Sequence, residues 1–383
     1  MGIACGAQNL KDVERLSAEG SSSARRFLGV GVRRVPDTTM RDFLCKLTPE
    51  SLTPALHRLV KAAHRRKALA SGDLSLGVLA LDGKRTPISG CDDHYAQRQT
   101  QSEQSPLVGA VRTVTATLVS SAARPVIDVI PIPASTNEMG YYEHALRTVF
   151  SHYSRCDLFR LITYDAGACS AHNGQVTREL GLHYLFRLKH PHTSLLDELY
   201  RALRSLTQRE CAAFTEDQNG QQLVRRSLWL LDSSTIVAPA GWEHLRSVLR
   251  VRSELLDTRG NVTASNDRYF VSSMPVSRLE PEQWLRIIRK HWGVELAHQT
   301  LDQAFTEDDK PWIRANPQGM LVVAVLRRIT FTLLALYRSI SLRSESHRAM
   351  PWKDLLRSVE LALLTATEPL LTGLRKHRVV LIE

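Results

Sequence analysis

Short apolar runs and amphipathic segments alternate through the middle of this chain, a pattern that predicts a domain of mixed strands and helices. Between residues 76 and 194, three strands are expected first, followed by a helix, a strand, a second helix and a fifth strand. That order predicts an α/β core built on a mixed sheet. The expected strands are 76–81, 110–120, 126–132, 160–164 and 184–188, and the expected helices are 137–152 and 172–180.

The pattern changes after this first part of the core. Residues 195–280 contain short segments in which polar and apolar residues alternate, with turn signals at Asn219-Gly220 and Arg259-Gly260. We interpret this region as a β-rich insertion. Helical periodicity returns at 281–340, and this part is expected to complete the core. The strands of the insertion are expected at 224–231, 247–255 and 267–273.

Helical regions flank the core on both sides, and the chain begins with a different kind of segment. Residues 1–36 are rich in Gly, Ser and Ala without strong periodicity, so we expect a poorly ordered N-terminus. Residues 37–75 carry leucines at helical spacing and predict a helical N-terminal segment. Residues 341–383 are expected to form a C-terminal helical tail.

The most apolar segment runs from Met320 to Leu336 and is not expected to cross a membrane. Arg327 and Arg328 lie at its centre, where each charge would cost about 2.5–3.5 kcal/mol in a bilayer. We interpret it as a buried helix whose polar stripe reaches a surface or a nucleic-acid backbone. No membrane partner is therefore predicted.

Composition narrows the class of protein. The 383 residues allow a substantial core, and 43% hydrophobic with 23% charged residues excludes a disordered chain. Lys and Arg number 50 against 39 Asp and Glu, and the net charge of +11 favours a polyanionic partner, with plain solubility as the alternative. The six cysteines show neither a C-x-x-C pair nor zinc spacing, which indicates reduced thiols in the cytoplasm.

Two of the apolar runs end in an aspartate, and a third carboxylate lies far downstream in a basic, aromatic helix. These residues are Asp82, Asp165 and Glu295. Carboxylates at the exits of two buried strands and on a neighbouring helix would form an oxygen cage, which hard divalent cations prefer. In a basic protein, this combination favours phosphodiester chemistry on nucleic acid.

The three acids belong to an ordered set of motifs. The set is Leu81-Asp82-Gly83-Lys84, then Tyr164-Asp165-Ala166, then His291-Trp292-x-x-Glu295-x-x-His298. The aspartates are 83 residues apart, and Glu295 follows Asp165 by 130 residues, a separation that includes the insertion. The set resembles the IS4-like DDE transposases and, within them, the ISAs1 or H-repeat-associated group. The resemblance extends over roughly residues 30–340.

This resemblance implies an RNase H-like mixed-sheet α/β catalytic core, interrupted by the β-rich insertion and flanked by helical segments. It implies a DNA transposase that cleaves and transfers strands at the ends of an insertion sequence. Asp82, Asp165 and Glu295 would be catalytic and would bind two Mg²⁺ ions, or Mn²⁺ instead, with Asp82 as the bridge. Water is the expected first nucleophile and the freed 3′-hydroxyl the second.

The resemblance also implies partners and a location. The expected partner is double-stranded DNA, comprising terminal inverted repeats and target DNA. A homodimer on DNA is expected by analogy. The expected location is the cytoplasm, in association with the nucleoid.

Several residues beside the acids are candidates for contacts with DNA. The alternative for the basic residues is simple exposure, and for the histidines a capped, partly exposed polar face. Trp292 is interpreted as a core anchor in preference to a base-stacking residue, and Asp302 as a surface residue. The DNA-contact candidates are Lys84, Arg85, Arg286, Arg289, Lys290, His291 and His298.

The sequence departs from the group's pattern at two places, which leaves two alternatives open. Leu296 stands where an asparagine commonly follows the glutamate, and Arg85-Thr86 replaces a Leu-Arg-like continuation. The region before Pro36 is also shorter than the group's usual N-terminal part. The first alternative is a catalytically decayed or repurposed DNA-binding protein. The second is a host nuclease of the RNase H-like fold.

Overall fold

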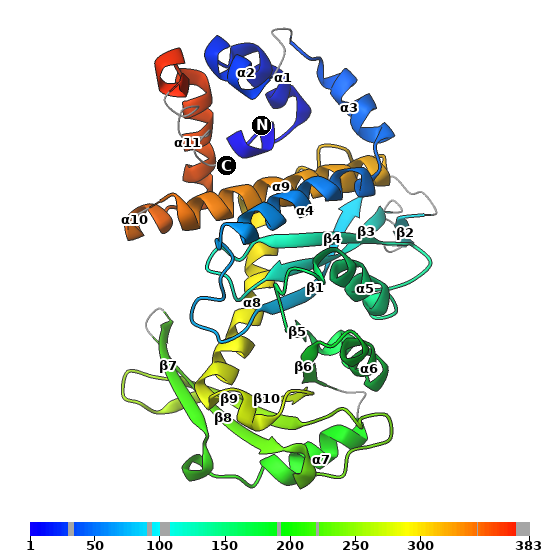
Figure 1. Cartoon of the computed structure of the whole chain (residues 1–383), viewed down its shortest axis with the longest axis vertical. Coiled ribbons are helices and arrows are strands. Elements are labelled where there is room, and N and C mark those ends of the chain that lie inside the picture. The colour runs from blue at the N-terminus through cyan, green and yellow to red at the C-terminus, as the bar shows by residue number, and fades with distance from the viewer. Residues whose placement is uncertain are drawn as a thin grey trace.

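The structure is a computed structural model that extends along one long axis (Figure 1). A group of helices lies at one end, the core sheet lies in the middle, and the insertion lies at the other end. The predicted turn at Asn219-Gly220 and the last part of the predicted tail, 373–383, fall outside the described residues. The described residues are 1–29, 34–89, 94–99, 108–189, 193–219, 222–342 and 344–372.

The core sheet mixes antiparallel and parallel pairs. β1 pairs with β3 and β3 with β4 in antiparallel fashion, whereas β5 is parallel to β1 and β6 is parallel to β5. The short β2 pairs with β3 beyond the end of β4. The predicted RNase H-like α/β core is therefore confirmed. The strands are β1 Val78–Ile88, β2 Ala96–Gln99, β3 Val108–Leu118, β4 Val126–Ile132, β5 Leu161–Tyr164 and β6 His183–Leu188.

Alternate residues of β1 belong to two different hydrophobic cores, because successive side chains of a strand point to opposite faces of the sheet. Leu79 and Leu81 pack on the face covered by α4, α5 and α6. Val78 and Ala80 pack on the opposite face, which α8 covers. These helices are α4 Pro49–Arg65, α5 Tyr142–Tyr153, α6 Ala171–Glu179 and α8 Pro281–Gln303.

The insertion continues the core sheet and does not form a sheet of its own. Its last strand, β10, pairs antiparallel with β6, and β9, β8 and β7 follow in that order. A helix, α7, precedes these strands and packs its leucines into the core on the α5 face. The elements are α7 Thr193–Leu203, β7 Ala213–Asn219, β8 Gln222–Asp232, β9 Ser247–Leu256 and β10 Val262–Ser272.

Helix α9, Pro317–Ile340, is long and apolar enough to span a membrane, but 78% of its most apolar window is buried inside the protein. Figure 1 shows α4 lying along it. Arg327 and Arg328 are each only 1% exposed, so the predicted polar stripe toward a surface or nucleic acid is wrong. Both guanidinium groups have partners inside the protein: Arg328 pairs with Glu307, and Arg327 donates to the Lys310 carbonyl and lies 5.7 Å from the centroid of the Trp312 ring.

The N-terminal segment differs from the expectation of poor order, because the described part of residues 1–36 contains helices. Asn9 caps α1 and Ser21 caps α2 by accepting a backbone N–H each, which offsets the weak periodicity. Their apolar residues pack against α11 in a small separate core. The remaining helices are α1 Leu10–Glu19, α2 Ser22–Leu28, α3 Asp37–Lys46, α10 Glu345–Arg348 and α11 Trp352–Thr365.

Short 3-10 helices complete the described elements. They are η1 Gly2–Cys5, η2 Ala166–Ala168, η3 Gln208–Glu210, η4 Ser233–Thr235 and η5 Val276–Arg278. One of them, η2, directly follows Asp165 and turns the chain away from the sheet.

Candidate active site

The first two acids lie on neighbouring parallel strands. Ala80 of β1 is opposite Thr163 of β5. The same register, carried two residues further, brings Asp82 opposite Asp165. Parallel pairing of two buried strands therefore places the two carboxylates next to each other, Asp82 within β1 and Asp165 directly after β5.

Asp82 does not lie at the exit of its strand, as the sequence predicted, because β1 continues to Ile88. Residues 83–88 remain paired with β3, and Asp82 itself is opposite Thr115. Lys84, Thr86 and Ile88 are buried after Asp82, so the alternation typical of a strand continues past the acid. Asp82 is consequently held by regular strand on both sides, whereas Asp165 follows the end of β5.

The third acid comes from α8, which packs on the Val78 face of the sheet. Trp284 and Ile287 are fully buried there. Glu295 and Asp165 together line a cavity of about 80 Å³. Burial raises the pKa of Glu295, and the negative charges of Asp82 and Asp165 raise it further. Glu295 is therefore close enough to both aspartates to be affected by their charge.

A fourth carboxylate, which the sequence analysis missed, lies beside the two aspartates. The Tyr164 hydroxyl donates a 2.6 Å hydrogen bond to Oε1 of Glu138, just before α5. A Cβ at position 83 would overlap the Glu138 carboxylate, so a larger residue after Asp82 would displace this carboxylate. Burial raises the pKa of Glu138, and the charges of Asp82 and Asp165 also raise it. Only Gly83 and Tyr164 could have signalled this acid, because no spacing in the sequence marks it.

Positive side chains from β6 and the residue after it face the second aspartate. Nη1 of Arg187 is 3.6 Å from Oδ1 of Asp165, and Nζ of Lys189 is 3.7 Å from Oδ2. Arg268 of β10 lines the same cavity as Glu295. These three cations were not among the predicted site residues, because they belong to other strands or their ends and no motif links them to the acids.

Trp292 is not a core anchor, contrary to the prediction. Its side chain is 45% exposed, and the Arg268 guanidinium lies 5.3 Å from its ring centroid. The neighbouring Trp284, two turns earlier, fills the core instead. Trp292 lines the cavity of Glu295 and presents an aromatic face beside the acids.

The two histidines of α8 have different surroundings. Nδ1 of His298 is 3.3 Å from Oδ2 of Asp82, and its Nε2 is buried with no hydrogen-bond partner among the described residues. Nδ1 of His291 is 2.9 Å from the Thr163 hydroxyl. Burial lowers the pKa of His291, so its ring is neutral at pH 7. His298 therefore contacts a site acid directly, whereas His291 connects α8 to β5.

Lys84 is not available for the predicted DNA contact. Its Nζ lies 2.6 Å from Oδ1 of Asp302 and 3.2 Å from Oδ2 of Asp308, and the residue is only 8% exposed. The alternation of β1 turns Lys84 inward beneath the end of α8, which corrects the Lys84 prediction. The Asp302 side chain remains 33% exposed, so it lies at the surface as interpreted, and it pairs with Lys84 there. Arg85, the next residue, is exposed, so its DNA contact stays a prediction.

The other three basic candidates lie on a different face of α8 from Glu295. Arg286, Arg289 and Lys290 line a second cavity of about 370 Å³ together with Arg124 from the β3–β4 connection. Arg289 pairs with Asp217, and Lys290 pairs with Asp73. These residues therefore do not surround the acids, although they form a basic surface on the same helix.

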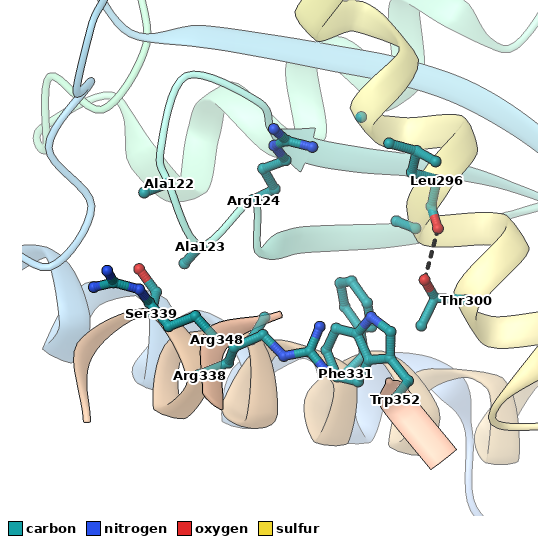
Figure 2. Close-up of a pocket in the computed structure, with 13 residues that line it drawn as sticks. Ala122, Ala123, Arg124, Leu296, Thr300, Phe331, Arg338, Ser339, Arg348 and Trp352 are labelled. Atoms are coloured by element: carbon teal, nitrogen blue, oxygen red, sulfur yellow. Dashed lines mark hydrogen bonds between the residues drawn. The ribbon is translucent and has the colours of Figure 1, made fainter. Parts of the chain in front are cut away.

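A third cavity, of about 480 Å³, adjoins this basic surface and shares Arg124, Gly293 and Leu296 with it. Figure 2 shows Arg124, Arg338 and Trp352 around the cavity, with Leu296 on α8 beside Arg124 and above Trp352. Leu296 is 49% exposed there. The departure from the group's pattern at this position thus points into a basic cavity and away from the acids.

The acids, their register and the insertion all fall within one family match. Residues 75–326 match the family model described as Transposase DDE domain, which is more than half of the chain and contains all four carboxylates. The chain belongs to the transposase DDE domain family. The predicted IS4-like DDE recognition is thereby confirmed at family level. No curated protein matches the chain.

The donor set of this DDE domain fits a divalent cation that prefers oxygen ligands, as DDE transposases generally use. Carboxylates reach the site from β1, β5, α8 and the segment before α5. The pKa of Glu138 and that of Glu295 are both raised, by burial first and by the neighbouring acids next. This mutual repulsion is what a bound divalent cation would relieve. Asp82, Asp165 and Glu295 could therefore hold such an ion, with Glu138 beside them.

Proposed function

We propose that this protein is a DNA transposase of the ISAs1 group, which cleaves strands at the ends of an insertion sequence and joins them to target DNA. The observation that carries the proposal is the convergence of Asp82, Asp165 and Glu295 from three distant parts of the chain. Terminal inverted repeats and target DNA are the proposed substrates. A homodimer on DNA, in the cytoplasm beside the nucleoid, is part of the same proposal.

In this proposal Asp82, Asp165 and Glu295 would hold two Mg²⁺ ions. When bound, the ions activate the attacking oxygen and stabilise the leaving oxygen. His298 holds the Asp82 carboxylate through its Nδ1, and this contact fixes the orientation of the acid. Arg187 and Lys189, which face Asp165, supply positive charge for the phosphodiester backbone.

The test of this proposal is strand cleavage by the full-length chain. A labelled duplex carrying the DNA that flanks the gene is incubated with Mg²⁺, with Mn²⁺, or with EDTA. We expect nicks at the element ends with either ion and none with EDTA. Binding without cleavage under both ions would contradict the proposed activity and indicate a decayed transposase. Cleavage at the same rate in duplexes with and without the terminal repeats would instead indicate a nuclease.

The decayed alternative is weakened by the position of Leu296. This residue is one of the departures that raised the alternative, and it lines the basic cavity of Figure 2, which Glu295 does not line. Adjacent residues of a helix point about 100° apart, so Leu296 lies on a neighbouring face of α8. Leu296 is therefore not part of the cavity that Glu295 and Asp165 line.

Glu138→Gln should weaken metal binding by about 10- to 100-fold, because the fourth carboxylate adds negative charge beside Asp82 and Asp165. Mn²⁺ affinity is measured by calorimetry, and nicking is titrated with Mg²⁺. Glu143→Gln is the matched control, because Glu143 lies on the adjacent turn and pairs with Arg147 and His172 at the surface. Equal Mn²⁺ affinities in the two variants would exclude a metal-site role for Glu138.

The basic surface of α8 is proposed to bind the DNA backbone. Arg124 and Arg286 are exposed and line the same cavity. Because each phosphate contact contributes about 0.9 to the dependence of log K on log salt, Arg124→Ala with Arg286→Ala should reduce that slope by about 2. The slope is measured by fluorescence anisotropy with a labelled duplex. The control is Arg209→Ala, which changes an exposed arginine of the insertion and should leave the salt dependence unchanged. If the double variant also kept the wild-type slope, this surface would not bind the DNA backbone.

A further inference from the structure

A second polar cluster lies on the Leu81 face of the sheet, opposite to the face toward which Asp82 points. It consists of His57 on α4, Asp128 on β4 and His152 on α5. Asp128 is opposite Ala116, which is opposite Leu81, so its side chain shares the face of Leu81. Asp82, the next residue of β1, points to the opposite face. The two clusters are therefore separated by the sheet.

The cluster is buried in a place where polar groups are costly. All seven residues of β4 are buried, and Asp128 is the one acid among them, with 2% of its surface exposed. His57 is 6% exposed. An ionised carboxylate in such surroundings requires a compensating partner. Its Oδ1 accepts the Val129 N–H at 2.9 Å, which leaves Oδ2 to be satisfied.

The remaining atoms converge without forming hydrogen bonds. Oδ2 of Asp128 and Nε2 of His57 are 3.1 Å apart, yet both atoms are buried and neither has a hydrogen-bond partner among the described residues. The His152 ring lies 4.0 Å from the His57 ring and is tilted by 33° to it. One ligand atom from each of the three residues lies within 4.8 Å of the other two.

This donor set is the one that zinc prefers. Two imidazole nitrogens and a carboxylate oxygen bind Zn²⁺ at about 2.0–2.2 Å in tetrahedral geometry. Ligand atoms on such a tetrahedron are about 3.3 Å apart, close to the His57–Asp128 separation. Because His152 is only partly buried, its ring can turn to bring the third nitrogen closer. Mg²⁺ prefers oxygen ligands alone, so the two clusters select different ions.

We propose that His57, Asp128 and His152 form a zinc site, with a fourth position for water or an added ligand. The ion would fasten α4, which belongs to the N-terminal helical segment, to β4 and α5 of the DDE core. Figure 1 shows α4 crossing above these elements, alongside α9. The proposed role of this site is structural, because the sheet separates it from Asp82 and Glu295, which are proposed to hold the catalytic ions.

The test uses Co²⁺ as a spectroscopic substitute for zinc in the full-length chain. The protein is stripped with a chelator, dialysed and titrated with Co²⁺, and the visible absorption of bound Co²⁺ is recorded; Zn²⁺ should then displace it. We expect one such site per chain and an upward shift of the melting temperature with Zn²⁺. Asp82→Asn should keep both signals, which separates this site from the acids on the other face.

His152→Ala is the decisive variant, because the residue is partly exposed and its loss should leave the fold intact. It should weaken Zn²⁺ binding at least tenfold and remove the thermal shift. His144→Ala is the matched control, since His144 is an exposed histidine on the same helix. A wild-type chain without Co²⁺ absorption, or a His152→Ala chain that binds zinc as tightly as the control, would overturn the proposal and leave a buried His–Asp ion pair.

Discussion

Asp82→Asn removes metal-dependent strand cleavage, with an expected loss of about 1,000-fold or more, equivalent to about 4 kcal/mol of transition-state stabilisation. Asparagine keeps the shape of the side chain but takes away the negative charge that would hold the cations. Binding of DNA should be retained, because the basic surface of α8 lies on another face of that helix. Nicking rates and mobility shifts of the same labelled duplex measure the two effects separately.

Asp165→Asn and Glu295→Gln should behave in the same way, because each acid contributes to the same cavity or strand edge. Asp157→Asn provides the control, since Asp157 is an exposed acid paired with Arg160 before β5. A variant of any of the three site acids that nicks at the wild-type rate would mean that the metal site lies elsewhere.

Glu307→Gln destabilises the fold by about 3–5 kcal/mol, the usual cost of breaking a buried ion pair from one side. Glu307 and Arg328 are each 1% exposed, and the variant leaves the guanidinium without its anion. Burial acts to raise the pKa of Glu307, but Arg328 and Arg327 outweigh it and lower the pKa. Urea unfolding at pH 7, followed by circular dichroism, gives the change in free energy of unfolding.

The lowered pKa of Glu307 also determines how the stabilisation by this residue changes with pH. A carboxyl whose folded pKa lies below its unfolded pKa stabilises the protein fully above the unfolded value. This stabilisation is lost as the pH falls through the folded pKa, so the difference between wild type and Glu307→Gln should shrink in acid. Asp309→Asn, an exposed acid two residues away, should be nearly neutral, and an equal effect of both variants would contradict the buried-pair explanation.

The succession of most core elements along the chain and the position of Asp165 after its strand could be predicted from the sequence, because both rest on local patterns. The run 126–132 is apolar throughout and forms β4 with those bounds. The predicted strand at 160–164 differs from β5 by one residue. The position of Asp165 after a strand could be predicted because strands and the turns that follow them have strong local signals. Glu295 could be identified because several residues around it match one motif.

The parts that could not be predicted depend on contacts between distant residues. Glu138 has no motif of its own, and its importance arises only when Tyr164 and Gly83 fold against it. Lys84 looks like a free cation beside Asp82, but it is neutralised by Asp302, more than two hundred residues later. Trp292 and Trp284 are alike in sequence terms, and only the rotation of α8 about its axis decides which one is buried.

The pairing of β10 with β6 has a mechanical consequence. Because backbone hydrogen bonds run without interruption from the core strands into the insertion, the two regions cannot swing like separate lobes without breaking a row of these bonds. Helix α8, 23 residues and roughly 34 Å long, lies across both and acts as a brace. A force exerted by DNA on the insertion would thus be transmitted directly to Glu295, and the acids would meet their substrate as a preassembled, stiff frame.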